Sequence, residues 1–67
     1  MEKFYNECSG VIARIGELQV MCDVERENAT PRVAAELEVL RLKLRDIEMQ
    51  MRSACFEFAC KEMDKRH

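Results

Sequence analysis

The stretch Asn28-Ala29-Thr30-Pro31 decides the fold, because it separates two long helical patterns. Asparagine tolerates the left-handed conformation in which many helices end. Threonine is a good N-cap, and proline at the first helical position lacks only an N–H group that would have no partner there. Pro31 also disfavours helix at Thr30. The sequence therefore predicts a break at residues 28–31, with one helix before it and another after it.

The segment after the break predicts a long second helix at about residues 31–64. No glycine or proline follows Pro31, so nothing interrupts this helix. Its apolar residues recur in alternating steps of four and three, which keeps them on one narrow face like the seam of a coiled coil. The members of this seam are Val33, Leu37, Leu40, Leu44, Ile47, Met51, Ala54 and Phe58.

The segment before the break predicts a first helix at about residues 2–27, with a matching seam in the same steps. The members of this seam are Phe4, Cys8, Val11, Ile15, Leu18 and Cys22, and Tyr5 and Ile12 widen it on one flank. Gly10 and Gly16 each cost about 1 kcal/mol in a helix interior. The two seams give each helix a face that can pack against the other.

The fold class expected from this pattern is all-α, an antiparallel two-helix hairpin that forms a single domain over residues 1–67. The connection between the helices is short, and short connections make antiparallel neighbours. Because the second helix is longer, we expect it to project past the first from about Cys55 onward. A chain of 67 residues is small for a self-sufficient core, so we expect the hairpin to complete a helical bundle by oligomerisation or by binding a partner.

A second apolar stripe runs along the long helix in strict steps of seven, about 120–200° away from the first seam. Its members are Ala35, Leu42, Met49, Phe56 and Met63. A helix with two apolar faces is typically buried on both sides, although exposed hydrophobic side chains are also common on protein surfaces. The predicted partner or oligomer interface is Leu42, Met49, Phe56, Phe58 and Met63.

A short basic strip, Arg41, Arg45 and Arg52, follows one flank of the long helix. We interpret it as a solvated helix edge. The alternative is a phosphate-contacting strip, which would make the chain a dimeric hairpin regulator that binds nucleic acid. The net charge of -2 and the interleaved acidic residues disfavour nucleic acid.

The sequence contains no recognisable catalytic, cofactor or metal motif. A two-helix hairpin has no water-excluding pocket in which to hold a general base or a nucleophile, so we expect no enzymatic activity.

The four cysteines lack the spacing of a zinc ribbon, and the single histidine is the terminal His67, so we expect no metal. Cys8 and Cys22 are interpreted as small buried hydrophobic residues of the seam. A Cys8–Cys55 disulfide is the alternative, since the antiparallel register would bring Cys8 level with residue 51 or 52, about a turn from Cys55.

The expected function is therefore that of a protein–protein interaction module such as an adaptor, a co-chaperone or an inhibitor. No apolar run approaches the roughly 20 residues of a membrane span, and the first residues lack the pattern of a signal peptide. We expect a cytoplasmic protein with a protein partner, a second copy of itself, or both.

Overall fold

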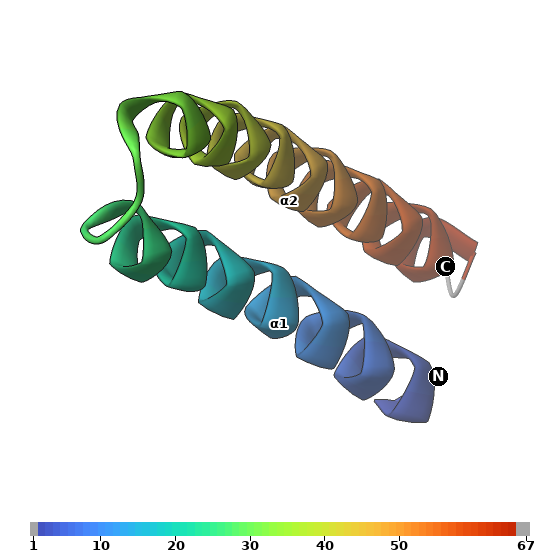
Figure 1. Ribbon diagram of the computed structural model, residues 1–67. Helices are drawn as coiled ribbons and strands as arrows, with labels where there is room; N and C mark the ends of the chain where they lie inside the picture. Colours follow the sequence, from blue (N-terminus) through green and yellow to red (C-terminus); the bar gives the residue numbers. More distant parts are fainter. Residues whose placement is uncertain (1, 66–67) are drawn as a thin grey trace.

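The computed structural model describes residues 2–65, which form two antiparallel α-helices joined by a short turn (Figure 1). Helix α1 spans Glu2–Arg26 and helix α2 spans Pro31–Lys65. The start of α1 and the end of α2 lie at the same end of the molecule, opposite the turn. The expected all-α hairpin is confirmed, and each helix ends within one residue of its predicted boundary.

The turn is built differently from the sequence-based expectation. The described residues include none with a positive φ angle, so Asn28 does not end α1 in the left-handed conformation. Instead the backbone N–H groups of Glu27, Asn28 and Ala29 donate to carbonyl oxygens three residues earlier, at 3.3–3.4 Å. Helix α2 then begins as predicted, because the Thr30 side-chain oxygen accepts from the N–H of Val33 at 3.4 Å.

These hydrogen bonds carry the chain onward for about one more turn beyond α1, and this changes the register between the helices. The Cys55 thiol is close enough to raise the pKa of Cys8, so Cys8 lies near Cys55 and not level with residue 51 or 52. The ring of Phe4 packs against the ring of Phe58, with 5.5 Å between their centroids. The expected projection of α2 beyond Cys55 is therefore wrong, since α1 reaches at least as far as Phe58.

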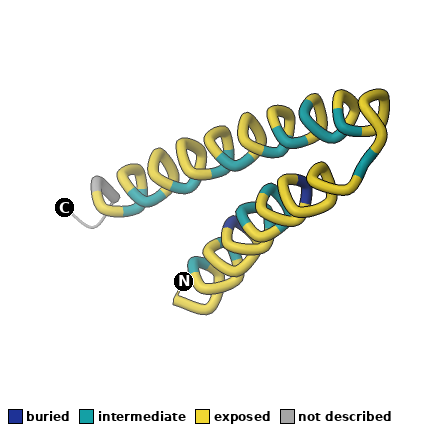
Figure 2. Tube along the Cα trace, turned by 60° about the vertical axis from the view of Figure 1, so that its left-hand side comes forward, coloured by how far each residue is buried: buried dark blue, intermediate teal, exposed yellow. Residues whose placement is uncertain are grey.

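The side chains between the helices form a thin line of contact and not a deep core. Figure 2 shows buried and intermediate residues along the side of each helix that faces the other, and exposed residues elsewhere. In the described residues only Ile12 and Cys22 are classed as buried, at 9% and 7% exposure. Cys8, Ile15, Leu18, Leu37, Leu44 and Met51 are half-buried as seam residues.

Other residues of the predicted seams are largely exposed to solvent. Phe4, Val11, Val33, Leu40 and Ile47 are exposed, and Ala54 is exposed as well. Both seams are turned by roughly 50° away from the line between the helix axes, toward one side of the hairpin. The opposite flank of the contact is occupied by polar and charged side chains that pair across the two helices, which explains the rotation.

Replacing both glycines by alanine should stabilise the hairpin. Neither glycine has a positive φ angle. A Cβ at Gly10 would have no heavy atom within 4 Å, and one at Gly16 would lie 3.4 Å from a Glu48 carboxylate oxygen, an ordinary contact. We expect Gly10→Ala with Gly16→Ala to raise the free energy of unfolding by about 1–2 kcal/mol, measured by urea denaturation. An unchanged or lower value would show that a glycine is needed for close packing.

Candidate interaction site

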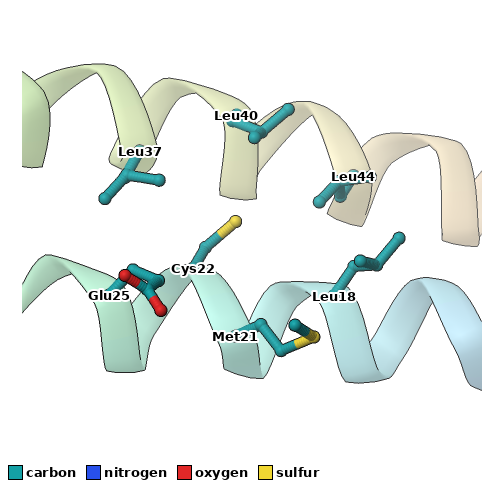
Figure 3. Close-up of a pocket in the computed structure, with 7 residues that line it drawn as sticks. All are labelled: Leu18, Met21, Cys22, Glu25, Leu37, Leu40 and Leu44. Carbon is teal, nitrogen blue, oxygen red and sulfur yellow. The ribbon is translucent and has the colours of Figure 1, made fainter.

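An apolar groove runs between the two helices on one side of the hairpin, near the turn. It has a volume of about 260 Å³. Its lining residues are Leu18, Met21, Cys22, Glu25, Leu37, Leu40 and Leu44. Figure 3 shows Leu37, Leu44 and Cys22 pointing into the space between the helices, whereas Leu40 and Met21 lie over their own helices. The groove is therefore a pair of apolar walls open to solvent, with Glu25 as its only charged lining residue.

The groove belongs to a longer apolar surface, which we call the apolar face. It consists of the seam residues that turned away from the helix contact, together with the outer walls of the groove. Its members are Phe4, Val11, Leu18, Met21, Val33, Leu40, Ile47 and Phe58. They follow the hairpin from the turn to the open end, because Val33 lies near the first and Phe58 near the second. Exposed apolar side chains that gather beside a groove mark an interaction surface more often than isolated exposed residues do.

The other side of the hairpin, which we call the charged face, carries ion pairs that cross between the helices. Arg26 of α1 pairs with Glu38 of α2. Arg41 pairs with the same Glu38 at 2.6 Å, and with Asp23 of α1 at 3.4 Å. These groups are partly exposed, so each pair contributes only about 0–1 kcal/mol. Their main effect is on geometry, because they fix which flank of each helix faces the other.

A second polar contact lies further along the charged face. The Gln19 amide donates to Glu48 at 3.0 Å, and Arg52 donates to the other carboxylate oxygen of Glu48 at 3.3 Å. Glu48 is half-buried at a position where a seam would otherwise hold an apolar residue. Gln19 and Glu48 therefore extend the polar flank toward the middle of the hairpin.

The ion pairs give the hairpin a defined response to acid. The hydrogen bond from Arg41, and then the positive charges of Arg41 and Arg26, hold the pKa of Glu38 below its ordinary value of 4.5, against the opposing effect of partial burial. The Glu38 carboxylate therefore binds a proton less readily in the folded state than in the unfolded state. The stabilisation is complete above pH 4.5 and is lost as the pH falls through the lowered pKa of Glu38.

Glu38→Gln should remove this part of the pH dependence. We expect the melting temperature of the variant to fall less steeply than that of the wild type as the pH is lowered from neutral into the acid range. Thermal unfolding at a series of pH values measures this. Glu36→Gln is the matched control, since Glu36 reaches only Arg32, at 3.6 Å on the exposed side of α2. Equal slopes for Glu38→Gln and the wild type would contradict the prediction.

The basic strip predicted as an alternative phosphate site is largely engaged in these pairs. Arg41 binds Glu38 and Asp23, and Arg52 binds Glu48. Hydrogen bonding to Glu38 also raises the pKa of Arg41. Arg45 is exposed without an ion-pair partner among residues 2–65. A phosphate would therefore have to compete with carboxylates for two of the three arginines.

The predicted partner interface is divided between two locations. Leu42, Met49, Phe56 and Met63 are exposed as a stripe along α2, at 45–71% exposure. Phe58, in contrast, packs against Phe4 and against Tyr5, at ring centroid distances of 5.5 and 6.2 Å. We refer to the first four residues as the outer stripe. Phe58 belongs to the apolar face and closes the open end of the hairpin.

The thiols are free in the described structure. Cys22 is buried behind the groove and Cys60 is exposed. Partial burial, followed by hydrogen bonding to Cys55, raises the pKa of Cys8 above its ordinary 9.0. No group of three or more potential metal ligands occurs within residues 2–65, and His67 lies outside the described residues.

Sequence reasoning missed the direction of the apolar face, since it placed Val33, Leu40 and Ile47 inside the hairpin. The described helices include none that is long and apolar enough to cross a membrane. No family model, curated protein or solved structure matches the chain.

Proposed function

We propose that this hairpin is a non-enzymatic protein-interaction module that works by packing its apolar face against another helical surface, as an adaptor, a co-chaperone or an inhibitor does. The observation that carries the proposal is the groove between Leu18 and Leu44, which is apolar and open to solvent. A protein partner that inserts apolar side chains there would bury the walls on both sides. Helix-in-groove recognition of this kind uses residues at helical spacing as anchors.

The free energy available on the apolar face supports binding. Fully burying a leucine, valine or phenylalanine side chain contributes about 1.5–3 kcal/mol, so covering a half-exposed one contributes about 1 kcal/mol. The apolar face carries seven side chains that are 38–51% exposed, spread over both helices, together with the half-buried Leu18. Association has its own entropic cost, and a face with several adjacent anchors can offset it where isolated side chains cannot.

The apolar face has a stronger claim than the outer stripe. Leu40 and its neighbours on the apolar face adjoin an apolar groove formed by two helices, whereas the hollow beside Met49 of the outer stripe is lined by α2 alone and includes Gln50, Ser53 and Glu57. Anchors that fill concave pockets contribute more to binding than those that rest on convex surfaces. The outer stripe remains the second candidate interface.

The nucleic-acid alternative has less support, because Arg41 and Arg52 are paired with carboxylates and the chain has a net charge of -2. A protein that binds nucleic acid usually presents a basic surface that is not neutralised internally.

The proposal also places the module in the cytoplasm. Free thiols persist in a reducing compartment, and the four cysteines of this chain are free in the structure.

A photoreactive amino acid introduced at position 40, and in a matched protein at position 42, tests the proposal in the cells that produce the chain. Leu40 and Leu42 are 47% and 45% exposed, so solvent access differs little between them. We expect irradiation to give covalent protein adducts from position 40 and few from position 42. Absence of adducts at position 40 would overturn the proposal, and adducts mainly at position 42 would move the interface to the outer stripe.

A further inference from the structure

We propose that the occupant of the apolar face is a second copy of this chain, so that two hairpins pack face to face as a four-helix bundle. This inference rests on the proposed function, since it names the partner of the same surface. It differs in requiring no other protein. In a two-fold symmetric pair the same patch is used twice, and each residue of the apolar face lies near a symmetry-related residue of the same face.

The broad side of the hairpin, which carries the apolar face, is large enough for a stable dimer. The hairpin measures 56 × 17 × 9 Å between Cα atoms, so its broad side covers on the order of 900 Å². Each partner in an interface of standard size contributes about 800 Å². Two copies that bury this side would reach the standard size without any further contact. The flat shape of the molecule supports the same arrangement. The hairpin is two helices wide and one helix thick, so a second layer of helices would pack on its broad side.

The small number of buried side chains also supports packing against a second copy. Within the described residues only Ile12 and Cys22 are buried, and the other apolar side chains of the contact are half-buried. A hairpin of two helices covers only one strip of each helix, whereas a helix in a four-helix bundle is covered by two neighbours. A second hairpin on the apolar face would bury Leu40 and Ile47 of α2 and Val11 of α1, which are the seam residues that the first contact leaves open.

Charge also favours a second copy. The groove in the apolar face has Glu25 as its only charged lining residue, so two copies that meet along the groove bury few like charges. The charged face, with Asp23, Arg26 and Arg41, lies on the other side and stays in solvent. The small net charge of -2 per chain adds little repulsion between two copies.

Leucines 40 and 42 provide a matched test. They are the same residue type on the same helix, two positions apart, with nearly equal exposure of 47% and 45%. Leu40 lies on the apolar face and Leu42 on the outer stripe. The molar mass of the purified wild type, Leu40→Glu and Leu42→Glu would be measured by light scattering over a concentration series, with a reductant present. We expect twice the chain mass of 7.9 kDa for the wild type and for Leu42→Glu. We expect Leu40→Glu to associate at least tenfold more weakly and to approach the mass of a single chain.

Circular dichroism of the same samples separates dissociation from unfolding. If Leu40→Glu loses its helical signal, Leu40→Ala replaces it, because alanine favours helix and removes only the contact. A folded wild-type chain that remains a monomer throughout the series overturns the inference, as does a Leu42→Glu variant that dissociates while Leu40→Glu does not. A monomer that still forms adducts with other proteins from position 40 leaves the proposed function standing, and a monomer without such adducts removes both.

Discussion

Replacing Ile12 by alanine should lower the free energy of unfolding by about 2–4 kcal/mol, which is a large part of what a chain of this size can have. Ile12 is one of two buried side chains among the described residues, and it is the larger of them. It lies near the middle of α1, away from both ends of the helix. The decrease in the free energy of unfolding therefore has two parts. One is the transfer free energy of the removed methylene and methyl groups, and the other is the cost of the cavity that they leave.

Val20→Ala is the control for this measurement. Val20 is 61% exposed on the same helix, so its truncation removes little contact, and alanine has the higher helix propensity. We expect a change within about 0.5 kcal/mol. Urea denaturation of both variants and the wild type at one protein concentration, with reductant, gives the comparison while the protein concentration, on which association depends, is held constant. Equal midpoints for Ile12→Ala and the wild type would show that the helices are not held together at this position.

The hairpin itself was predictable because its signals are local. Thr30 and Pro31 mark a helix start within two residues, and the helical periodicity on each side needs no knowledge of the other helix. The predicted helices at 2–27 and 31–64 accordingly differ from Glu2–Arg26 and Pro31–Lys65 by one residue at an end. Which residues lie level across the hairpin depends instead on the conformation of the turn and on the contacts between the helices.

The register was wrong because it depends on how the turn is made. An end of α1 at Asn28 in the left-handed conformation would reverse the chain early, whereas the three hydrogen bonds of Glu27, Asn28 and Ala29 advance it by about one turn first. Both conformations suit the same residues, so the sequence of the turn does not choose between them. The difference of one turn brings Cys8 to Cys55 and Phe4 to Phe58.

The rotation of the seams was missed because apolar spacing on a single helix says nothing about polar pairs between helices. A signal was present in the sequence. Asp23 and Arg26 on α1 are three residues apart, as are Glu38 and Arg41 on α2, and the antiparallel arrangement brings each acidic residue to a basic one. Pairing these residues first would have fixed the register, and would have turned Leu40 and Ile47 toward the open side.

Oxidation should join Cys8 to Cys55 and stabilise the hairpin. The two thiols are already in contact across the helices, and both are half-buried. A small-molecule disulfide such as oxidised glutathione accepts the two electrons. One protein thiolate attacks it to form a mixed disulfide, and the second thiol displaces the remaining small thiol. The bond closes a loop of about 48 residues, for which the loss of chain entropy in the unfolded state predicts about 4 kcal/mol, with measured values commonly about 2–4 kcal/mol.

The pH at which the reaction proceeds follows from the surroundings of Cys8. Only the thiolate attacks, and partial burial with the hydrogen bond to Cys55 raises the pKa of Cys8 above 9.0. The reaction should therefore be slow at neutral pH and faster as the pH rises toward that range. Peptide mapping after oxidation identifies the bond, and urea denaturation of the oxidised and reduced forms measures the change in stability.

Cys8→Ser and Cys60→Ser separate this bond from the other pairings that four thiols allow. Cys60→Ser should oxidise and gain stability like the wild type, because Cys60 is exposed and lies away from the Cys8–Cys55 contact. Cys8→Ser should do neither. A bond that includes Cys60, a covalent dimer, or an internal bond without a gain in stability would each contradict the register that places Cys8 opposite Cys55. The same register places Phe4 against Phe58, so one oxidation experiment tests how the whole open end of the hairpin is assembled.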